Sequence, residues 1–536
     1  MIKRQKTICC VHLIVLVGLV FSLIGLSMYN CQTAQATSAS TVKSTADTTA
    51  HPPLTVVTPY QIKNLDPVKN GFWFSEFGSA ELPMMWDRDF VVKPWVLKSL
   101  EQIDDLNWRL TLRPEVTFQN GKPLDAKALA AVMDRQLKLS PRVQSDLPGA
   151  TVKVTGKFEV VLTTQEPTPT VPNILASESV FPVYDVEVVE AVGEDYEKLA
   201  GSGFYTGPYQ VVSLDDRALV LERYEGYWQG IPPLPGVTVG FVPDAQARIL
   251  AVQNGEADMA LYVPSDVERI LEGREDAFLV AAKRSRQGAR LVLNLRKAPF
   301  DARLMRRAFQ LGIDYETIGN DVLGSGCDVA RSFFPPGFSW SLENQITDPE
   351  LANKLLDEAG WVKGDDGIRM KDDQRLQVTM LISPRQPDEE PISIAMQAQL
   401  REIGFDIAIQ SVESPTDAMK KDVIPWNAAL TFAGPIGGGG APDSGLQRYI
   451  ASDGDRNYGG ISDPKLDSLI DGLSVTFDVE QRAKLLKEIQ KIIVEEQAYQ
   501  CMLAFKLFKY VVSPAYSGYI GSQNWLHITF ETKPTN

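Results

Sequence analysis

Short segments of alternating apolar and polar residues recur along the chain and are separated by turn-forming residues. Residues 376–382 alternate in this way and are rich in aliphatic side chains, which predicts a strand. Residues 391–403 place apolar side chains at helical spacing and end at Gly404, after which residues 405–409 alternate again. A strand, a helix and a strand in this order predict a βαβ unit and therefore a parallel sheet in an α/β fold.

The same patterns predict elements elsewhere in the chain. No unit of 20–50 residues repeats, which argues against a solenoid. The other predicted elements are strands at 54–58 and 108–112, a turn at Asn120-Gly121, a helix capped by Asp125, a hairpin of residues 209–214 and 219–221, and a helix over 482–496.

The first 36 residues have a pattern of their own. Lys3-Arg4-Gln5-Lys6 precedes an uncharged run at 8–26, and Ala34-Gln35-Ala36 is a small-x-small cleavage pattern before a polar linker at 37–53. This order is typical of a secretory signal peptide. The apolar run is also close to the length that spans a bilayer, so an uncleaved N-terminal anchor stays open, as does lipidation at Cys31. All three alternatives place most of the protein outside the cytoplasm.

Length and charge narrow the class of protein. With 536 residues the chain is long enough for two or three lobes. Its formal net charge is −15 at pH 7, and such a surface repels phosphate backbones, so we expect no nucleic-acid partner. Only Cys327 and Cys501 would remain after cleavage at Ala36, either as one disulfide or as two buried thiols.

Motifs of catalysis are missing from the sequence. The three histidines are His12, His51 and His527, so only His527 lies beyond the signal and the linker, and no partner for a catalytic triad is evident. There is no Gly-x-Ser-x-Gly elbow, phosphate-binding loop, His-Glu-x-x-His or Cys-x-x-Cys motif. Residues 453–457 imitate the start of a calcium loop, but Tyr458 stands where that loop needs glycine, which favours a polar turn. We therefore expect neither catalytic residues nor a metal site.

A series of short motifs follows one another in order from about Leu54 to the C-terminus. They are Leu65-Asp66-Pro67, Pro94 to Lys98, Asp104-Asp105, residues 108–124, Thr206-Gly207-Pro208-Tyr209, Tyr227-Trp228, Gly255-Glu256-Ala257-Asp258, Leu293-Asn294, Ala298-Pro299-Phe300-Asp301, Arg306-Arg307-Ala308, Asp348-Pro349 and Leu355 to Trp361. In this order the motifs resemble those of the family 5 extracellular solute-binding proteins, the group that serves oligopeptide, dipeptide and nickel importers.

The resemblance implies an α/β fold of the two-lobed periplasmic-binding-protein type (type II, the large class with an inserted subdomain), with mixed sheets flanked by helices. Lobe I would combine residues 54–92, 201–288 and 500–536, and the subdomain would comprise residues 93–200. Lobe II would run over 289–499. Two chain crossings would form a hinge, and the ligand would lie between the closing lobes.

The sequence departs from the family pattern in residues 432–443. Peptide-binding members carry a Trp and an ammonium-binding Asp before a Pro-containing turn, and the resemblance places these positions at Pro435 and Gly438. A buried ammonium without a counter-charge costs several kcal/mol, so we expect poor binding of unmodified peptides. Asp443 either supplies the lost charge or caps a helix that begins near Ser444. The glycine run, including Gly434, Gly438 and Gly440, either forms a flexible loop or enlarges the cleft and exposes backbone N–H groups.

On the opposite side of the expected cleft, Asn70-Gly71-Phe72-Trp73 follows Leu65-Asp66-Pro67 in what the resemblance implies is a ligand-contacting loop. Aromatic faces favour stacking on flat or apolar groups and on cations. Trp426 and Phe432 are expected to contribute in the same way from lobe II, and Asn294 completes the candidate ligand-binding residues.

The resemblance implies the extracytoplasmic binding component of an ABC importer. Such a protein captures a peptide-like or metallophore-like solute between two lobes and delivers it to a membrane permease. We expect a monomer that holds no cofactor. Two other classes stay open, a ligand sensor for a signalling partner and a secreted hydrolase. Permease and ATPase genes beside the gene favour the importer, whereas turnover abolished by one carboxylate substitution favours the hydrolase.

Overall fold

The computed structural model describes residues 51–535 apart from 88–90, 265, 284–286, 437–440 and 523–524. The chain divides into residues 1–49 and residues 50–536, and the structure described here is that of the second unit. The predicted signal peptide or anchor, the cleavage pattern and Cys31 lie outside the described residues. Among the described residues, no helix combines the length and the apolar character needed to cross a bilayer.

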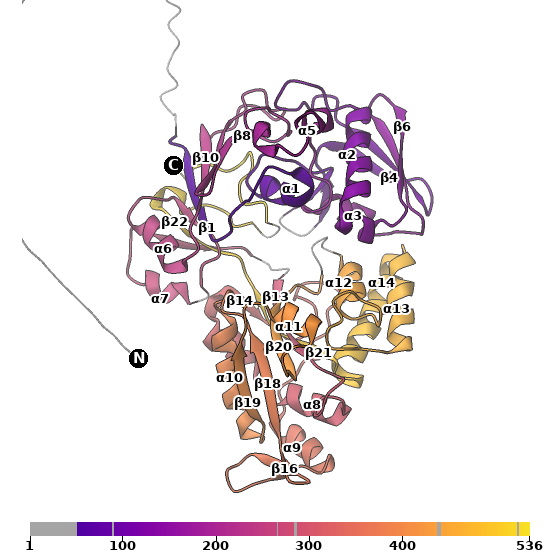
Figure 1. Cartoon of the computed structure of the whole chain (residues 1–536), viewed down its shortest axis with the longest axis vertical. Helices are drawn as coiled ribbons and strands as arrows, with labels where there is room; N and C mark the ends of the chain where they lie inside the picture. Colours follow the sequence, from indigo (N-terminus) through magenta and orange to yellow (C-terminus); the bar gives the residue numbers. More distant parts are fainter. Residues whose placement is uncertain are drawn as a thin grey trace, which may run out of the picture. The chain divides into compact units, whose positions relative to one another are not determined.

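One half of the described chain is built on a seven-stranded sheet, which we call lobe I (Figure 1). Its strands follow in the order β12 (Phe278–Ala281), β22 (Lys509–Val512), β11 (Met259–Ala260), β1 (Leu54–Thr58), β10 (Gly236–Phe241), β9 (Ala218–Arg223) and β8 (Tyr209–Leu214). β1 pairs in parallel with both β10 and β11. Val56 packs with Phe74 of α1 (Pro67–Glu76), whereas its neighbour Val57 packs with Ile249 of α6 (Ala245–Gln253). The alternation of β1 thus buries both faces of the sheet.

A four-stranded antiparallel sheet forms the subdomain that is inserted into lobe I. Its order is β4 (Leu97–Gln102), β5 (Asn107–Leu112), β7 (Glu159–Thr163) and β6 (Thr151–Gly156). α2 (Ala126–Leu139) shares a hydrophobic core with this sheet, in which Leu129 packs with Leu110 and Val160. Asp125 caps α2 as predicted, since its carboxylate accepts hydrogen bonds from two backbone N–H groups at 3.0 Å. α3 (Pro141–Asp146) follows directly.

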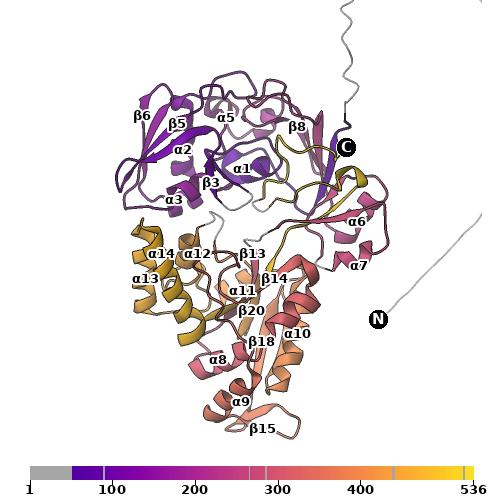
Figure 2. The same ribbon diagram turned by 180° about the vertical axis from the view of Figure 1, so that it is seen from behind.

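The other half, lobe II, is built on a six-stranded mixed sheet. Its order is β14 (Cys327–Val329), β21 (Gln500–Lys506), β13 (Gln287–Leu293), β20 (Ala428–Phe432), β18 (Gln377–Ile382) and β19 (Asp406–Ser411). β18, α10 (Glu389–Glu402) and β19 form the predicted βαβ unit, because β18 and β19 pair in parallel. α8 (Arg303–Leu311), α9 (Pro349–Glu358) and α10 share one core with this sheet. The other face is covered by α12 (Pro442–Tyr449), α13 (Pro464–Val475) and α14 (Val479–Gln490), and both views show these helices opposite α10 (Figures 1 and 2).

The chain crosses twice between the two large sheets. It leaves lobe I after β12 and enters lobe II at Gln287, and it returns at Leu507 and Phe508, between β21 and β22. The predicted boundary at residue 500 is therefore wrong by seven residues, because β21 pairs with β13 and β14 of lobe II. β21 is buried from residue 500 to 505 and carries no turn signal at its start, so the apolar pattern did not mark the crossing.

Candidate functional site

Three chain segments end at the same edge of the lobe I sheet. Tyr60 follows β1 and Tyr262 follows β11, two strands that run in parallel. Phe508 precedes β22, which is antiparallel to β11, so its start lies at the edge where β11 ends. This is also the edge at which the chain crosses to lobe II. In α/β sheets, ligands bind outside the carboxyl ends of parallel strands.

Six aromatic side chains meet at this edge, and we call them the aromatic wall. Tyr60 lies 5.6 Å from Trp73 and 4.8 Å from Tyr262, measured between ring centroids. Tyr262 lies 5.8 Å from Phe508 and 6.0 Å from Trp525. All six residues are at least partly exposed, although Trp73, Tyr262 and Phe508 also pack against the core of lobe I, so the wall lies at the rim of that core. The wall consists of Tyr60, Phe72, Trp73, Tyr262, Phe508 and Trp525.

The wall is directed toward lobe II. Burial raises the pKa of the Tyr60 hydroxyl, and the positive charges of Arg248 and Arg385 act in the opposite direction. Arg385 belongs to lobe II and follows β18 there. Phe508 itself is one of the two residues of the return crossing. The wall therefore lies on the side of lobe I that is near Arg385 and the return crossing.

Two residues of the wall have a strained backbone. Tyr262 has φ of 53° and Trp525 has φ of 67°, in the left-handed region that bulky side chains rarely adopt. Arg248 of α6 holds the first of them, since its guanidinium donates to the carbonyl oxygens of Leu261 at 3.0 Å and Tyr262 at 2.7 Å. Strain of this kind costs about 1–3 kcal/mol per residue and persists where the surrounding structure holds a functional geometry.

A neutral polar pair lies behind the wall. Burial raises the pKa of Glu76 at the end of α1 well above its usual range, and the charge of Glu178 adds to this shift. Burial lowers the pKa of His527 to about 3. His527 Nδ1 lies 2.9 Å from the Tyr510 hydroxyl, while its Nε2 is 3.9 Å from Glu76 Oε2, too far for a hydrogen bond. Both shifts favour the uncharged forms of the two groups.

The predicted ligand residues of lobe I lie on a helix and not on a loop, which corrects that expectation. Pro67 begins α1 and Asp66 caps it. Phe72 and Trp73 belong to the wall, whereas the Asn70 amide donates to the side chain of Asn64 at 2.7 Å. Gly71 is needed for packing, because a Cβ at this position would lie 2.5 Å from Pro182 Cγ.

The lobe II candidates fall into two groups. Asn294 and Trp426 are buried together, where the Asn294 amide donates to the Trp426 carbonyl oxygen at 3.2 Å. Phe432 and Gly434 keep partial access to solvent at the end of β20, and the Lys506 ammonium lies 5.9 Å from the centroid of the Phe432 ring. Gly438 and Gly440 lie outside the described residues.

Asp443 plays a different role from either one expected of it. α12 begins at Pro442 and not near Ser444, its N-cap is Ala441, and the Asp443 side chain does not cap it. The Asp443 carboxylate is buried and forms an ion pair with Arg482 of α14 at 2.5 Å. Burial raises its pKa, and Arg482 partly offsets this shift. Asp443 therefore ties two helices of lobe II together and does not supply a free charge.

The two cysteines beyond the predicted signal peptide are not bridged. Cys327 and Cys501 are free thiols, so the alternative of one disulfide is wrong. In the described part of the chain, no three His, Cys, Asp or Glu side chains gather in a way that could hold a metal ion. Arg448 and Asp455 form an ion pair at 3.0 Å in the turn that imitates a calcium loop.

A groove of lobe I lies beside the wall. It has a volume of about 1060 Å³ and lies between β2 (Met84–Trp86) and the C-terminal segment. Its lining includes Tyr519, Leu526 and His527. His527 thus separates the wall from the groove, which makes the groove the main competing location for a ligand.

Four of the six wall residues were not predicted from the sequence. Tyr60, Tyr262, Phe508 and Trp525 come from separate parts of the chain, and only the tertiary structure brings them together. One signal was available for Tyr60, which follows a predicted strand by two residues. No local pattern marks the other three.

Comparisons with known proteins agree with this architecture. The family model described as "Bacterial extracellular solute-binding proteins, family 5 Middle" matches residues 91–457. The nickel-binding protein NikA of Staphylococcus aureus is 23% identical over 442 residues, which are 82% of this chain and 85% of that protein. The glutathione-binding protein GsiB of Salmonella paratyphi A is 26% identical over 439 residues, 78% of this chain and 82% of that protein.

Solved structures show the same fold. The crystal structure of NikA from Brucella suis in complex with Fe(III)-EDTA has a TM-score of 0.79 at 21% identity and covers 90% of this chain and 100% of that chain. The expectation of a two-lobed binding-protein fold is confirmed by this likeness.

Proposed function

The chain belongs to the family 5 bacterial extracellular solute-binding proteins, and from that premise we propose that the aromatic wall is the surface on which its solute binds. Members of this family are the solute-binding components of ABC importers, and this chain is one of them. It captures a small molecule or a peptide for a membrane permease. The identity of the solute and the residues that hold it are the subject of the proposal.

The strained backbone of the wall carries the proposal. Tyr262 and Trp525 both adopt left-handed conformations, and their rings lie 6.0 Å apart on one partly exposed surface. Ordinary packing does not require two unfavourable backbone conformations in one cluster of partly exposed residues. Arg248 holds the Tyr262 carbonyl, so the geometry is set before a ligand arrives, which lowers the entropic cost of binding.

The chemistry of the wall favours a solute with a flat or apolar part. Indole and phenol rings stack on planar groups, and each such contact contributes about 0.5–1.5 kcal/mol beyond the buried area. Peptide-like and metal-chelate solutes both fit this description. The curated relatives include a nickel-binding and a glutathione-binding protein, which supports the same two classes for this chain.

We further infer that the solute is enclosed by movement of lobe II over the wall. Phe508 belongs both to the wall and to the return crossing, so rotation about the two crossings would cover the wall. The subdomain already touches lobe II, since the rings of Trp108 and Phe477 lie 6.3 Å apart. On this account the protein works as a monomer outside the cytoplasm, catalyses no reaction and does not bind nucleic acid.

The experiment compares the solute retained by three purified proteins, using native mass spectrometry and titration calorimetry. They are wild type, the wall variant Trp73→Ala and the control Trp361→Ala. Trp361 follows α9, a helix that Figure 1 shows at the end of lobe II away from lobe I, and it is not one of the wall residues. Reduced glutathione, Ni(II)–L-histidine, haem and unmodified di- to pentapeptides serve as titration probes.

We expect wild type and Trp361→Ala to carry the same small-molecule mass, and Trp73→Ala to lose it. Truncation of an aromatic anchor costs about 2 kcal/mol, or roughly thirtyfold in Kd. The proposal is wrong if Trp73→Ala retains the solute to the same extent as wild type. It is equally wrong if wild type retains no solute and binds none of the probes.

A further inference from the structure

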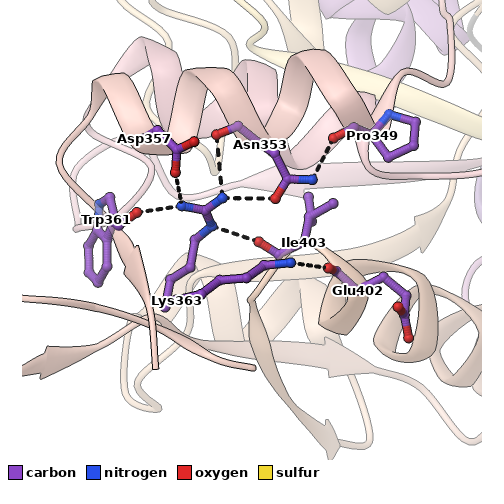
Figure 3. A network of polar contacts seen from close by, with 8 residues as sticks. Pro349, Asn353, Asp357, Trp361, Lys363, Glu402 and Ile403 are labelled. Carbon is purple, nitrogen blue, oxygen red and sulfur yellow. Dashed lines mark hydrogen bonds and ion pairs between the residues drawn. The ribbon is translucent and has the colours of Figure 1, made fainter. Parts of the chain in front are cut away.

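Four arginine side chains are buried in the described part of the chain: Arg248, Arg290, Arg306 and Arg369. In three of them, Nε and both terminal nitrogens of the guanidinium donate hydrogen bonds. Figure 3 shows the environment of Arg369, whose guanidinium donates to the carbonyl oxygen of Ile403 at 2.9 Å, to Asp357 at 2.5 Å and to Asn353 Oδ1 at 2.8 Å. Arg248 and Arg306 each bind backbone carbonyl oxygens through Nε and both terminal nitrogens.

Arg290 is the exception. Only 3% of its surface is exposed, yet neither Nε nor Nη1 has a hydrogen-bond partner, and the guanidinium takes part in no ion pair with a described residue. Burial lowers its pKa to about 10, so it keeps its proton at neutral pH. A buried cation without a partner costs several kcal/mol, which makes such a group rare in a finished core.

The surroundings of Arg290 add positive charge and polar donors. Its guanidinium stacks on the ring of Tyr449 at 4.0 Å, and Arg456 lies 6.0 Å from the same ring. Thr431 is its direct neighbour across the β13–β20 pair, and the Thr431 hydroxyl is also buried without a partner. No acidic group is among the charges that shift the pKa of Arg290, and Asp455 and Asp443 of the same lobe pair with Arg448 and Arg482.

Arg290 and Thr431 lie on neighbouring strands of the lobe II sheet. Arg290 lies in β13, the strand that follows the first crossing from lobe I, and Thr431 stands one residue before Phe432 at the end of β20. Tyr449, Arg456 and Tyr458, which surround the guanidinium, are all partly exposed. The guanidinium is therefore buried, whereas the three residues around it are partly exposed.

We propose that Arg290, with Thr431, Tyr449 and Arg456, forms an anion subsite in lobe II that binds a carboxylate of the solute. The guanidinium and the hydroxyl supply unused donors, and the second arginine adds charge. A bound anion would supply the counter-charge that Arg290 lacks. Binding would therefore remove the free-energy cost of the unpaired buried cation. This subsite deepens the proposed function and rests on it, because it assigns an acidic group to the solute that stacks on the wall.

The test uses simple anions, so that it does not depend on knowing the solute. Thermal unfolding of the full chain is measured at pH 7.5 in sodium acetate, sodium phosphate and sodium chloride at equal ionic strength. We expect acetate to raise Tm above the chloride value in wild type and in Arg217→Gln, an exposed control. In Arg290→Met the apparent affinity for acetate should fall at least tenfold, and Arg290→Lys should retain part of it. A larger response to phosphate than to acetate would assign a phosphate group to the solute in place of the carboxylate.

A second measurement separates a binding role from a structural one. Urea unfolding in chloride should show Arg290→Met to be as stable as wild type or more stable, because an unpaired charge has been removed. Arg369→Met should be clearly destabilised, since it leaves carbonyl groups without a donor. The subsite is refuted if Arg290→Met keeps the acetate response, if wild type has none, or if Arg290→Met loses as much stability as Arg369→Met. Trp73→Ala should keep the acetate response even if it loses the solute, so failure of the wall and failure of the subsite are distinguishable.

Discussion

Replacing Arg248 by methionine should destabilise lobe I and weaken solute binding together. The Arg248 guanidinium donates four hydrogen bonds to carbonyl oxygens, to Leu261 at 3.0 Å, Val242 and Pro243 at 2.8 Å each and Tyr262 at 2.7 Å. Hydrogen bonds to charged groups contribute about 1.5–3 kcal/mol each, and part of the loss is offset because the buried charge disappears as well. We therefore expect the free energy of unfolding to fall by about 4 kcal/mol.

The assay is urea unfolding followed by circular dichroism, with titration calorimetry of the retained solute as a second readout. Arg248→Lys keeps the charge but cannot reach all four carbonyl groups, so it should lose about half as much. Arg217→Met is the matched control, because its side chain is 91% exposed, and it should stay within about 0.5 kcal/mol of wild type. Since the Tyr262 carbonyl loses its donor, Arg248→Met should also bind the solute at least tenfold more weakly. A loss of less than 1 kcal/mol together with unchanged affinity would refute the view that Arg248 holds the wall.

Three further predictions concern other parts of the molecule. Burial raises the pKa of Glu81 to about 7 from its ordinary 4.5. The stability that Glu81 contributes is therefore complete below pH 4.5 and is lost as the pH rises to 7. In urea titrations between pH 4.5 and 8, Glu81→Gln should remove this loss of up to about 3 kcal/mol. Gly71→Val should lower the free energy of unfolding by about 1–3 kcal/mol, because its side chain would collide with Pro182. Gly472→Ala in α13 should be neutral or stabilising, because nothing lies within 4 Å of an added Cβ there. Equal effects of the two variants would contradict the packing argument. Burial raises the pKa of the Cys501 thiol to about 12, so iodoacetamide at pH 8 should label Cys501 only after unfolding, and rapid labelling of the native protein would show that this thiol is accessible.

Local patterns in the sequence predicted those helices and strands whose signals lie within a short stretch of the chain. The β18–α10–β19 unit and the Asp125 cap follow from periodicity and from one side chain, and both are present in the structure. The sequence did not predict that the chain returns to lobe I at Leu507. β21 is apolar along its length, and no turn signal marks the point where the chain leaves lobe II. Family motifs, and not periodicity, indicated the two-lobed fold.

The candidate site was predicted only in part, because its residues converge from distant positions. Phe72 and Trp73 were identified as a cluster in the sequence, although the helix that carries them was not. Tyr262 and Trp525 reach the wall through tertiary structure, and their left-handed backbones leave no trace in composition. Arg290 was likewise invisible, since an arginine in an apolar strand becomes informative only when its missing partners are known.

The most direct test of the account is a crystal structure of the protein purified from its own host with its solute retained. The account predicts solute density against Trp73, Tyr262 and Trp525 of the aromatic wall, with an acidic group near Arg290 when lobe II covers it. Density in the groove between β2 and the C-terminal segment, or anywhere that leaves the wall uncovered, would contradict the central claim.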